Sequence, residues 1–448
     1  MALGKRVYKH SETCLSSRRK CDVVIPVSEV LEKVSQEIEK LRDEMVQTLV
    51  ELIKIPAISP DYGYEGEYDK AQKLLEIIKD WPFDKVEVYN APDERAKNGV
   101  RPSILAYYYG EKGEESPRLW ILTHLDVVPP GDLSKWTVTE PFKPVVKDGK
   151  VYGRGSEDNG QSLVASLYAV RAMMNLGIRP KRTVILAFVS DEETGSKYGV
   201  EWLMKNHPEL FRKDDLVLVP DGGNEDGTFI EVAEKSILWL KVRVKGKQVH
   251  ASMPDKGLNA HRVALDFAYH LDRLLHEKYG ERDELFDPPE STFEPTMVKN
   301  PADSPNIAPG EHELVFDCRV LPRYSLDEVL ADAEKLAEEV KGRYRTELDG
   351  EVLPEIEFEV LQRVDAPEPT DPNSEIVKLL QEALRKLRGK EAKVGGIGGG
   401  TFAAYFRRKG IPAVVWATLD EMAHQPNEYA KIDNMVEDAK VMAALALL

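Results

Sequence analysis

The fold of this chain is decided by the stretch Thr183-Val-Ile-Leu-Ala-Phe-Val-Ser190, which the acidic residues Asp191, Glu192 and Glu193 follow directly. This apolar run stops at the length of a β-strand. A similar run, 119–123, leads into His124-Leu125-Asp126. Apolar strands that end in polar, chemically active residues are typical of an α/β sheet with a site at the ends of its strands.

Strand-like and helix-like segments alternate on both sides of this stretch. An amphipathic helix capped by Ser28 and running to Leu49 is expected first. The expected strands and helices that follow are 104–108, 119–123, 160–176, 183–190, 200–211 and 216–220. The alternation predicts an α/β fold with a βαβ-built, mostly parallel sheet.

The pattern changes near Glu231, which indicates an inserted α+β domain. The expected elements there are a strand at 237–245, a helix at 260–279, a proline-rich stretch at 288–309, a strand at 313–320, a helix at 326–340 and a strand at 355–361. Helix and strand then alternate again from Ser374, after a linker at 365–372. We therefore predict a loose tail (1–27), a discontinuous domain (28–235 and 362–448) and an inserted domain (236–361).

Composition narrows the classes of partner. Of 448 residues, 42% are hydrophobic and 31% charged, so a sizeable core and a charged surface are expected. The net charge of −17 opposes binding to nucleic acid or to anionic membranes. No apolar run approaches the ~18 residues of a membrane span, so a soluble protein is expected.

The three cysteines, Cys14, Cys21 and Cys318, do not suggest a disulfide framework, which favours a reducing compartment such as the cytoplasm. The basic N-terminal tail lacks the apolar segment of a secretory signal, and a transit peptide is the alternative.

Polar residues follow several of the expected strands at their carboxyl ends, where open α/β sheets bind ligands. His124, Asp126, Glu192 and Glu193 follow the two runs above, Asp221 follows 216–220, and His424 lies beyond 413–419. Asp158 sits in a turn before a helix. A single acid at a strand end is usually a helix cap or a loop residue. Together, however, these histidines and carboxylates are the ligand types that hold zinc, cobalt or manganese.

Seven motifs follow one another along the chain after the tail. They are His124-x-Asp126, Gly153-Arg-Gly-x-x-Asp158, Asp191-Glu-Glu-x-Gly195, His250-Ala-Ser-x-Pro-x-x-Gly-x-Asn-Ala260, Asp317-x-Arg319, Gly399-Gly-Thr401 and His424-x-x-Asn-Glu428. In this order they resemble the motifs of the M20 family of metallopeptidases and N-acyl-amino-acid deacylases, and the resemblance covers nearly everything after the tail. This family includes succinyl-diaminopimelate desuccinylase, acetylornithine deacetylase, carboxypeptidase G2 and dipeptidases.

The resemblance implies two divalent metal ions per chain, zinc or cobalt first and manganese second. It places His124, Asp158 and Asp221 on one ion and Asp158, Glu193 and His424 on the other, so that Asp158 bridges. Asp126 would accept the second ring proton of His124. Glu192 would be the general base, taking a proton from water and passing it to the leaving nitrogen. For Glu192, a further metal ligand or a solvated loop acid is the alternative.

The resemblance also implies hydrolysis of the amide bond of N-acyl amino acids or short peptides with a free carboxylate. His250, in the inserted domain, would stabilise the oxyanion in the partner subunit of a homodimer; a capping or surface histidine is the alternative. The residues implied to bind substrate, chiefly its carboxylate, are Asn306, Arg319, Gly399, Gly400 and Thr401. For Arg319, an ion pair with Asp317 is the alternative.

At two positions the sequence departs from the motifs of the family. The enzyme could therefore be a desuccinylase-type deacylase or a dipeptidase or carboxypeptidase, and the substrate stays open between them. Asn159 and Gly160 follow Asp158 where many relatives carry a lysine, and Asp221 stands where desuccinylases carry Glu. A different reaction class is the rival hypothesis. A dinucleotide-binding fingerprint is matched by residues 398–403 together with the distant Asp420, which would make the protein a NAD-dependent oxidoreductase. That hypothesis leaves the predicted metal ligands unexplained. A catalytically silent metal-binding protein is the third class.

Overall fold

The computed structural model describes residues 26–299 and 302–448, so most of the predicted tail, with Cys14 and Cys21, lies outside the described residues. Contacts divide the chain into two compact units. The first unit holds the described residues up to Val232 with Thr370–Val394 and Tyr405–Leu448, and the second holds Ala233–Pro369 and Gly395–Ala404. The domain boundaries drawn from the sequence stay a prediction.

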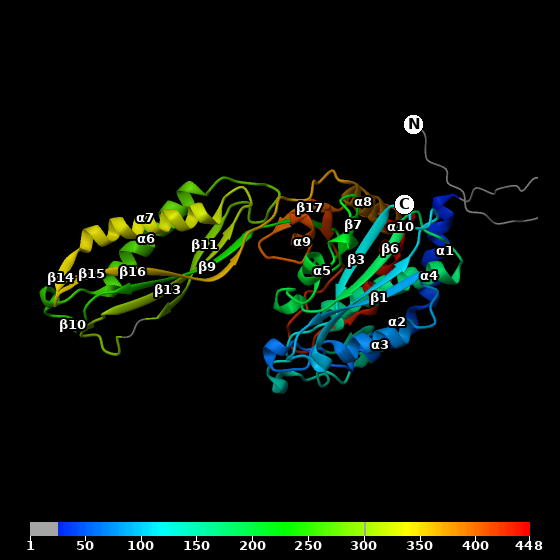
Figure 1. Cartoon of the computed structure of the whole chain (residues 1–448), viewed down its shortest axis with the longest axis horizontal. Coiled ribbons are helices and arrows are strands. Elements are labelled where there is room, and N and C mark those ends of the chain that lie inside the picture. Colours follow the sequence, from blue (N-terminus) through cyan, green and yellow to red (C-terminus); the bar gives the residue numbers. More distant parts are fainter. Residues whose placement is uncertain (1–25, 300–301) are drawn as a thin grey trace, which may run out of the picture. The chain divides into compact units, whose positions relative to one another are not determined.

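A sheet of eight strands lies mainly in the first unit (Figure 1). Its strand order is β1-β2-β6-β3-β7-β18-β8-β17. Its strands are β1 (Lys85–Pro92), β2 (Val100–Tyr108), β6 (Thr183–Val189), β3 (Arg118–His124), β7 (Leu216–Val219), β18 (Ala413–Val415), β8 (Phe229–Glu234) and β17 (Lys393–Ile397). β3 pairs in parallel with β6 and β7, and β18 pairs in parallel with β7. The predicted α/β fold with a mostly parallel sheet is confirmed, with antiparallel strands towards its edges.

Helices of the first unit bury apolar faces in its core. They are α1 (Val27–Lys40), α2 (Arg42–Ile53), α3 (Tyr68–Ile78), α4 (Ser162–Asn175), α5 (Val200–Asn206), α8 (Glu375–Arg388), α9 (Ala403–Arg408) and α10 (Ile432–Leu447). α4 and α10 are buried along most of their length and pack against each other, as helices that are apolar all round do.

The single helix predicted from Ser28 to Leu49 is wrong in two respects. The first helix begins at Val27 with Pro26 at its N-cap, so Ser28 already lies inside it and makes no cap. The chain then breaks at Leu41, whose φ of −87° and ψ of 1° lie outside the helical region. Leu41 is itself buried, and the break lets α1 and α2 each bury its own apolar side.

The second unit has a four-stranded antiparallel sheet with two long helices on one face (Figure 1). The sheet consists of β11 (Thr292–Lys299), β13 (Glu311–Val320), β9 (Ser236–Lys245) and β16 (Glu355–Val364), and the helices are α6 (Ala260–Lys278) and α7 (Leu326–Tyr344). Alternate residues of β9 are buried against these helices. β11 lies inside the proline-rich stretch 288–309, in which no strand was predicted. Its Pro295 is accommodated because β11 is an edge strand and its register shifts between Pro295 and Met297.

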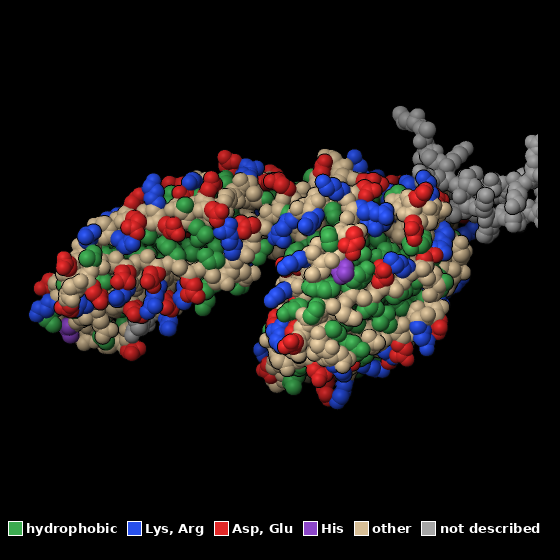
Figure 2. Space-filling view, in the orientation of Figure 1, with side chains coloured by type: hydrophobic (Ala, Val, Ile, Leu, Met, Phe, Trp, Pro, Cys, Tyr) green, Lys and Arg blue, Asp and Glu red, His purple; other side chains and the backbone are tan. Residues whose placement is uncertain are grey.

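Short strands complete the described structure. They are β4 (Val145–Lys147), β5 (Lys150–Tyr152), β10 (Val249–His250), β12 (Ile307–Ala308), β14 (Thr346–Leu348), β15 (Glu351–Leu353) and β19 (Tyr429–Lys431). Acidic and basic side chains are interspersed over the face drawn in Figure 2. Across residues 26–299 and 302–448, each helix is too short or too polar to cross a bilayer.

Candidate metal centre

The five metal ligands predicted from the sequence lie together in the first unit. His124 ends β3, and Asp221 comes two positions after the end of β7. Glu193 lies in the turn Glu192–Thr194, just beyond β6. Asp158 belongs to the turn Ser156–Gln161, which leads into α4, and His424 follows β18. His124 and Val189 are register partners on parallel strands, so the segments after β3 and β6 leave the same edge of the sheet.

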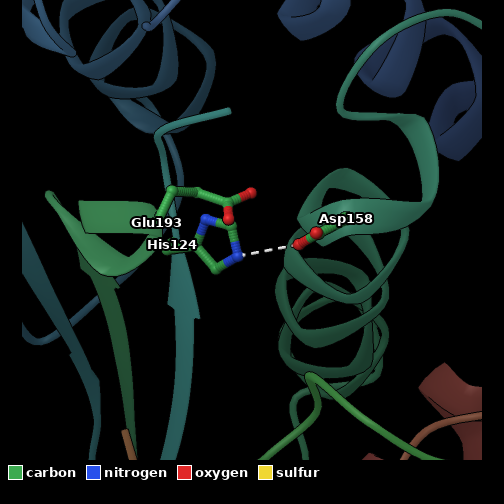
Figure 3. Close-up of side chains that lie close together, drawn as sticks. All are labelled: His124, Asp158 and Glu193. Carbon is green, nitrogen blue, oxygen red and sulfur yellow. Dashed lines mark hydrogen bonds and ion pairs between the residues drawn. The ribbon is translucent and has the colours of Figure 1, made fainter. Parts of the chain in front are cut away.

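Asp158 faces a histidine with each of its carboxylate oxygens. Its Oδ1 lies 3.0 Å from Nε2 of His124, and its Oδ2 lies 3.1 Å from Nε2 of His424. Glu193 Oε2 is 3.1 Å from the same nitrogen of His424, and Asp221 Oδ1 is 3.5 Å from Nε2 of His124. Figure 3 shows His124, Asp158 and Glu193 converging from separate elements. This is the arrangement expected of a carboxylate shared between two cations.

Ligand atoms come close enough to hold a metal in two overlapping groups, His124 with Asp158 and Glu193, and His124 with Glu192 and Asp221. In each group the atoms lie within 4.8 Å of one another. Glu192 therefore belongs to one of these groups, as Glu193 belongs to the other. The division of these residues into two ligand sets and a base stays a prediction.

The chemistry of the site fits a divalent cation. Oε1 of Glu193 is a buried acceptor without a hydrogen-bond partner among the described residues. Burial, together with the nearby Asp158 carboxylate, raises the pKa of Glu193 to about 8. Burial and the neighbouring Asp221 likewise raise the pKa of Glu192. Bound cations would offset this crowding of carboxylates, and imidazole and carboxylate donors suit zinc, cobalt or manganese.

Asp126 connects His124 to both glutamates. His124 Nδ1 lies 2.9 Å from the backbone carbonyl of Asp126, nearer than the 3.4 Å to its carboxylate. Because a carbonyl can only accept, this contact places the ring proton on Nδ1, so Nε2 is the nitrogen that would bind a cation. The Asp126 carboxylate accepts the backbone N–H groups of Glu192 at 3.1 Å and Glu193 at 3.0 Å. Asp126 thus fixes the turn that carries both.

Asn159 was noted in the sequence only as a departure from relatives with a lysine. Its Nδ2 donates to Oδ1 of Asp221 at 2.9 Å and to the Pro220 carbonyl at 3.0 Å. Its Oδ1 accepts the backbone N–H of His124 at 3.2 Å. Asn159 therefore orients one predicted ligand and anchors another, a role that only the fold reveals.

A buried network of charged residues stabilises the turn of Glu192 and Glu193 through Asp191, and the sequence analysis did not predict it. Arg101 donates to Glu67 at 2.6 and 2.5 Å and to Asp191 at 3.1 Å. Asp191 has a φ of 68°, an uncommon backbone conformation that this network stabilises. The three residues are far apart in the chain and form no motif.

His250 and the predicted substrate-binding residues belong to the second unit. His250 lies exposed in β10, opposite Ile307 of β12, and its Nδ1 accepts from the N–H and hydroxyl of Ser252 at 3.2 and 2.8 Å. Asn306 is exposed beside this pair, and its backbone carbonyl accepts the N–H of Ala251 at 2.8 Å.

The groups predicted to bind the substrate carboxylate already have partners within the second unit. Arg319 donates to Asp317 at 2.6 and 3.0 Å and to the Gly398 carbonyl at 2.9 Å, so the ion pair named as the alternative is formed. The Thr401 N–H and hydroxyl donate to Glu234 at 2.8 and 2.5 Å. Gly399 and Gly400 lie in the same loop, with Gly400 exposed.

Known proteins resemble this chain over most of its length. The model of peptidase family M20/M25/M40 matches residues 120–448. An uncharacterized metallohydrolase of Methanocaldococcus jannaschii is 43% identical over 410 residues, which cover 90% of this chain and 98% of that protein. Succinyl-diaminopimelate desuccinylase of a Nitratiruptor species is 27% identical over 389 residues, 86% of this chain and 94% of the enzyme.

Among solved structures, the dipeptidase Dug1p of Saccharomyces cerevisiae has a TM-score of 0.66 at 17% identity and covers 94% of this chain and 98% of its own. That likeness supports the fold. The family match and the 43% identical relative carry the assignment: the chain belongs to peptidase family M20/M25/M40 and is a metallohydrolase.

Proposed function

We propose that the protein hydrolyses the amide bond of N-acyl amino acids or short peptides that carry a free carboxylate, at a site for two divalent ions. The observation that carries this proposal is the position of Asp158, whose two oxygens lie 3.0 and 3.1 Å from Nε2 of two different histidines. A carboxylate in that position suits the bridge between two cations.

The proposed ligands are His124, Asp158 and Asp221 for one ion and Asp158, Glu193 and His424 for the other. When bound, zinc or cobalt ions, with manganese as the next choice, lower the pKa of water and polarise the substrate carbonyl. Glu192 takes a proton from the attacking water and delivers it to the leaving nitrogen. Asp126 keeps Glu192 and Glu193 in one fixed turn by accepting both of their N–H groups.

His250 is proposed to donate a hydrogen bond to the oxyanion that forms at the substrate carbonyl. Its Nδ1 accepts from the Ser252 N–H, so the proton of the neutral ring belongs on Nε2, where it is available to a ligand. His250 is exposed, which suits a role at the site of a second protomer in a homodimer.

Recognition of the substrate carboxylate is assigned to Asn306, Arg319, Gly399, Gly400 and Thr401. The bonds to Asp317 and to the Gly398 carbonyl use three of the five N–H donors of Arg319, which leaves two, within the described residues, for a substrate carboxylate. Relatives are named both as a desuccinylase and as a dipeptidase, and both substrate classes contain an amide and a free carboxylate.

Family membership leaves the nicotinamide alternative without support. Asp420, the acid of that fingerprint, instead accepts the Tyr429 hydroxyl at 2.8 Å and pairs with Lys431 at 2.7 Å. We propose a reducing, cytoplasmic location from the small number of cysteines in the sequence; among the described residues, Cys318 is buried and in no disulfide.

The test uses the full chain, loaded with zinc or cobalt, on a panel of N-acyl amino acids and dipeptides. The released amine is quantified by mass spectrometry. Matched substrates whose carboxylate is replaced by an amide serve as controls. We expect hydrolysis of at least one class, with much less of its amide controls. A metal-loaded protein that cleaves nothing in the panel would leave a silent metal-binding protein as the better account.

A further inference from the structure

Glu157 is adjacent to the bridging Asp158, yet its carboxylate binds a different loop. The side chain is buried, and it accepts the backbone N–H groups of Asp420 at 2.9 Å and Met422 at 2.6 Å. Both donors belong to the segment 420–428, which carries His424. One residue therefore ties the loop of His424 to the turn of Asp158.

Glu428, at the far end of that segment, makes the reverse connection. Its buried carboxylate accepts the N–H groups of Glu157 and Asp158, both at 3.0 Å, and of Gly155 at 2.9 Å. The Arg154 guanidinium donates to it at 2.8 Å. Each loop thus supplies a glutamate to backbone donors of the other. We name this pair, Glu157 and Glu428, the glutamate clasp.

The segment 420–428 needs such support because its backbone is strained. Glu421, His424 and Asn427 have φ values of 60°, 63° and 58°, in the left-handed region that residues other than glycine rarely adopt. The segment lies between the short strands β18 and β19 and contains neither helix nor strand. The side chain of His424 is 55% exposed, whereas that of His124 is fully buried, so surrounding packing holds His424 less firmly.

We infer that Glu157 is a positioning residue for the second ion of the proposed metal site: it fixes the loop of His424 and thereby sets the affinity of the position made by Asp158, Glu193 and His424. This inference rests on the proposed two-metal function. Glu157 does so without touching the ion, because its oxygens are engaged by Asp420 and Met422.

The first ion position does not depend on these two bonds. His124 is held at the end of β3 by the sheet, and Asp221 is oriented by Asn159 at 2.9 Å. Asp158, which both positions share, is anchored through its N–H by Glu428, and Glu428 is itself held by Arg154 and the Gly155 N–H without the Glu157 side chain. Loss of the Glu157 carboxylate should therefore weaken the second ion selectively, whereas a general loss of structure would weaken both.

The experiment compares the full-length wild type with Glu157→Gln, both stripped of metal. Cobalt is added stepwise, its visible absorption is followed, and the bound metal is counted after equilibrium dialysis. Groups that orient metal ligands are typically worth about 10- to 100-fold in affinity. We expect Glu157→Gln to bind the first ion as the wild type does and the second ion at least ~10-fold more weakly.

Glu421→Gln is the matched control, because Glu421 is exposed on the same segment and the substitution removes the same charge. It should bind both ions like the wild type. Glu157→Asp keeps the charge but shortens the reach, so it should also weaken the second ion. Glu157→Asp carries the test if Glu157→Gln does not fold.

The bonds from the Asp420 and Met422 N–H groups to Glu157 can also be tested without metal, by hydrogen exchange. Hydrogen exchange in the peptide that contains Asp420 and Met422 should be faster in metal-free Glu157→Gln than in the wild type, and unchanged in Glu421→Gln. If the wild type binds two ions and a folded Glu157 variant binds the second ion equally well, the inference about the clasp is overturned and the two-metal function is not. A wild type that never binds a second ion would overturn the two-metal function, and this inference with it.

Discussion

Substitution of Arg101 by methionine tests the buried network that supports the turn of Glu192 and Glu193. Arg101 is fully buried, as is Glu67, and its guanidinium donates to Glu67 at 2.6 and 2.5 Å and to Asp191 at 3.1 Å. Methionine retains much of the apolar length and removes the charge and all of these donors. Asp191 keeps the N–H of Tyr198 at 2.9 Å, whereas the Glu67 carboxylate keeps, among the described residues, a weaker bond from the Asp191 N–H at 3.2 Å.

The expected cost follows from leaving Glu67 as a buried charge without its counter-ion. Breaking a buried ion pair by removing one partner typically costs about 3–5 kcal/mol. Native domains are stable by only about 5–15 kcal/mol, so Arg101→Met should lower the urea midpoint markedly. The replacement Glu67→Gln in the Arg101→Met background removes the uncompensated charge and should recover part of the loss.

The loss of stability in Arg101→Met should also depend on pH. Burial raises the folded-state pKa of Glu67, and loss of Arg101 removes the group that opposes this rise. The folded variant then binds more protons than the unfolded chain above the ordinary carboxyl pKa, so its stability rises as the pH falls. Urea unfolding followed by tryptophan fluorescence at pH 7 and at pH 5.5 should therefore show a smaller deficit at the lower pH.

Arg385→Met is the matched control, since Arg385 and its partner Glu391, at 2.8 Å, are both exposed. It should unfold like the wild type because exposed ion pairs contribute little to stability. A loss below ~1 kcal/mol for Arg101→Met, the value typical of an exposed pair, would refute the idea that this network is a buried, stabilising one.

The remaining predictions concern the site. Chelation should abolish hydrolysis and zinc or cobalt should restore it, with up to two ions per chain by metal analysis; full activity in a metal-free sample would contradict the two-metal site. Asn159→Ala frees Asp221 and should weaken the first ion about 10- to 100-fold in a cobalt titration, whereas unchanged binding would show that Asp221 needs no such support. His250→Ala should retain its metal but lose about 10²- to 10³-fold in turnover. Mixed with inactive Glu192→Ala, it should regain activity through heterodimers, and a mixture that exchanges subunits yet stays inactive would place His250 in cis or outside catalysis.

Local patterns were enough to predict the parallel sheet and the residues at its edge. The apolar runs before His124 and Asp191 became β3 and β6, and their parallel register brings the polar residues after them together. Features set by tertiary contacts were missed. The helix break at Leu41 and the edge strand around Pro295 depend on packing and pairing that no local pattern reveals.

The supporting groups of the site were harder still to predict. Glu157 stands beside Asp158 in the sequence, but its partners are more than 260 positions away. Arg101 and Asp191 meet only because β2 and β6 are neighbours in the sheet. A carboxylate or guanidinium of this kind is recognised by its burial and its partners, which exist only in the folded chain.

The most direct test of the account is the turnover and metal content of Glu192→Ala, measured on the best substrate of the panel. The account predicts a folded protein that binds two ions as the wild type does and loses about 10²- to 10⁴-fold in turnover, the contribution of a positioned general base. Glu193→Ala, the neighbouring control, should instead lose metal. A Glu192→Ala protein that keeps most of its turnover, or that loses an ion as Glu193→Ala does, would contradict the assignment of Glu192 as the base of a two-metal hydrolase.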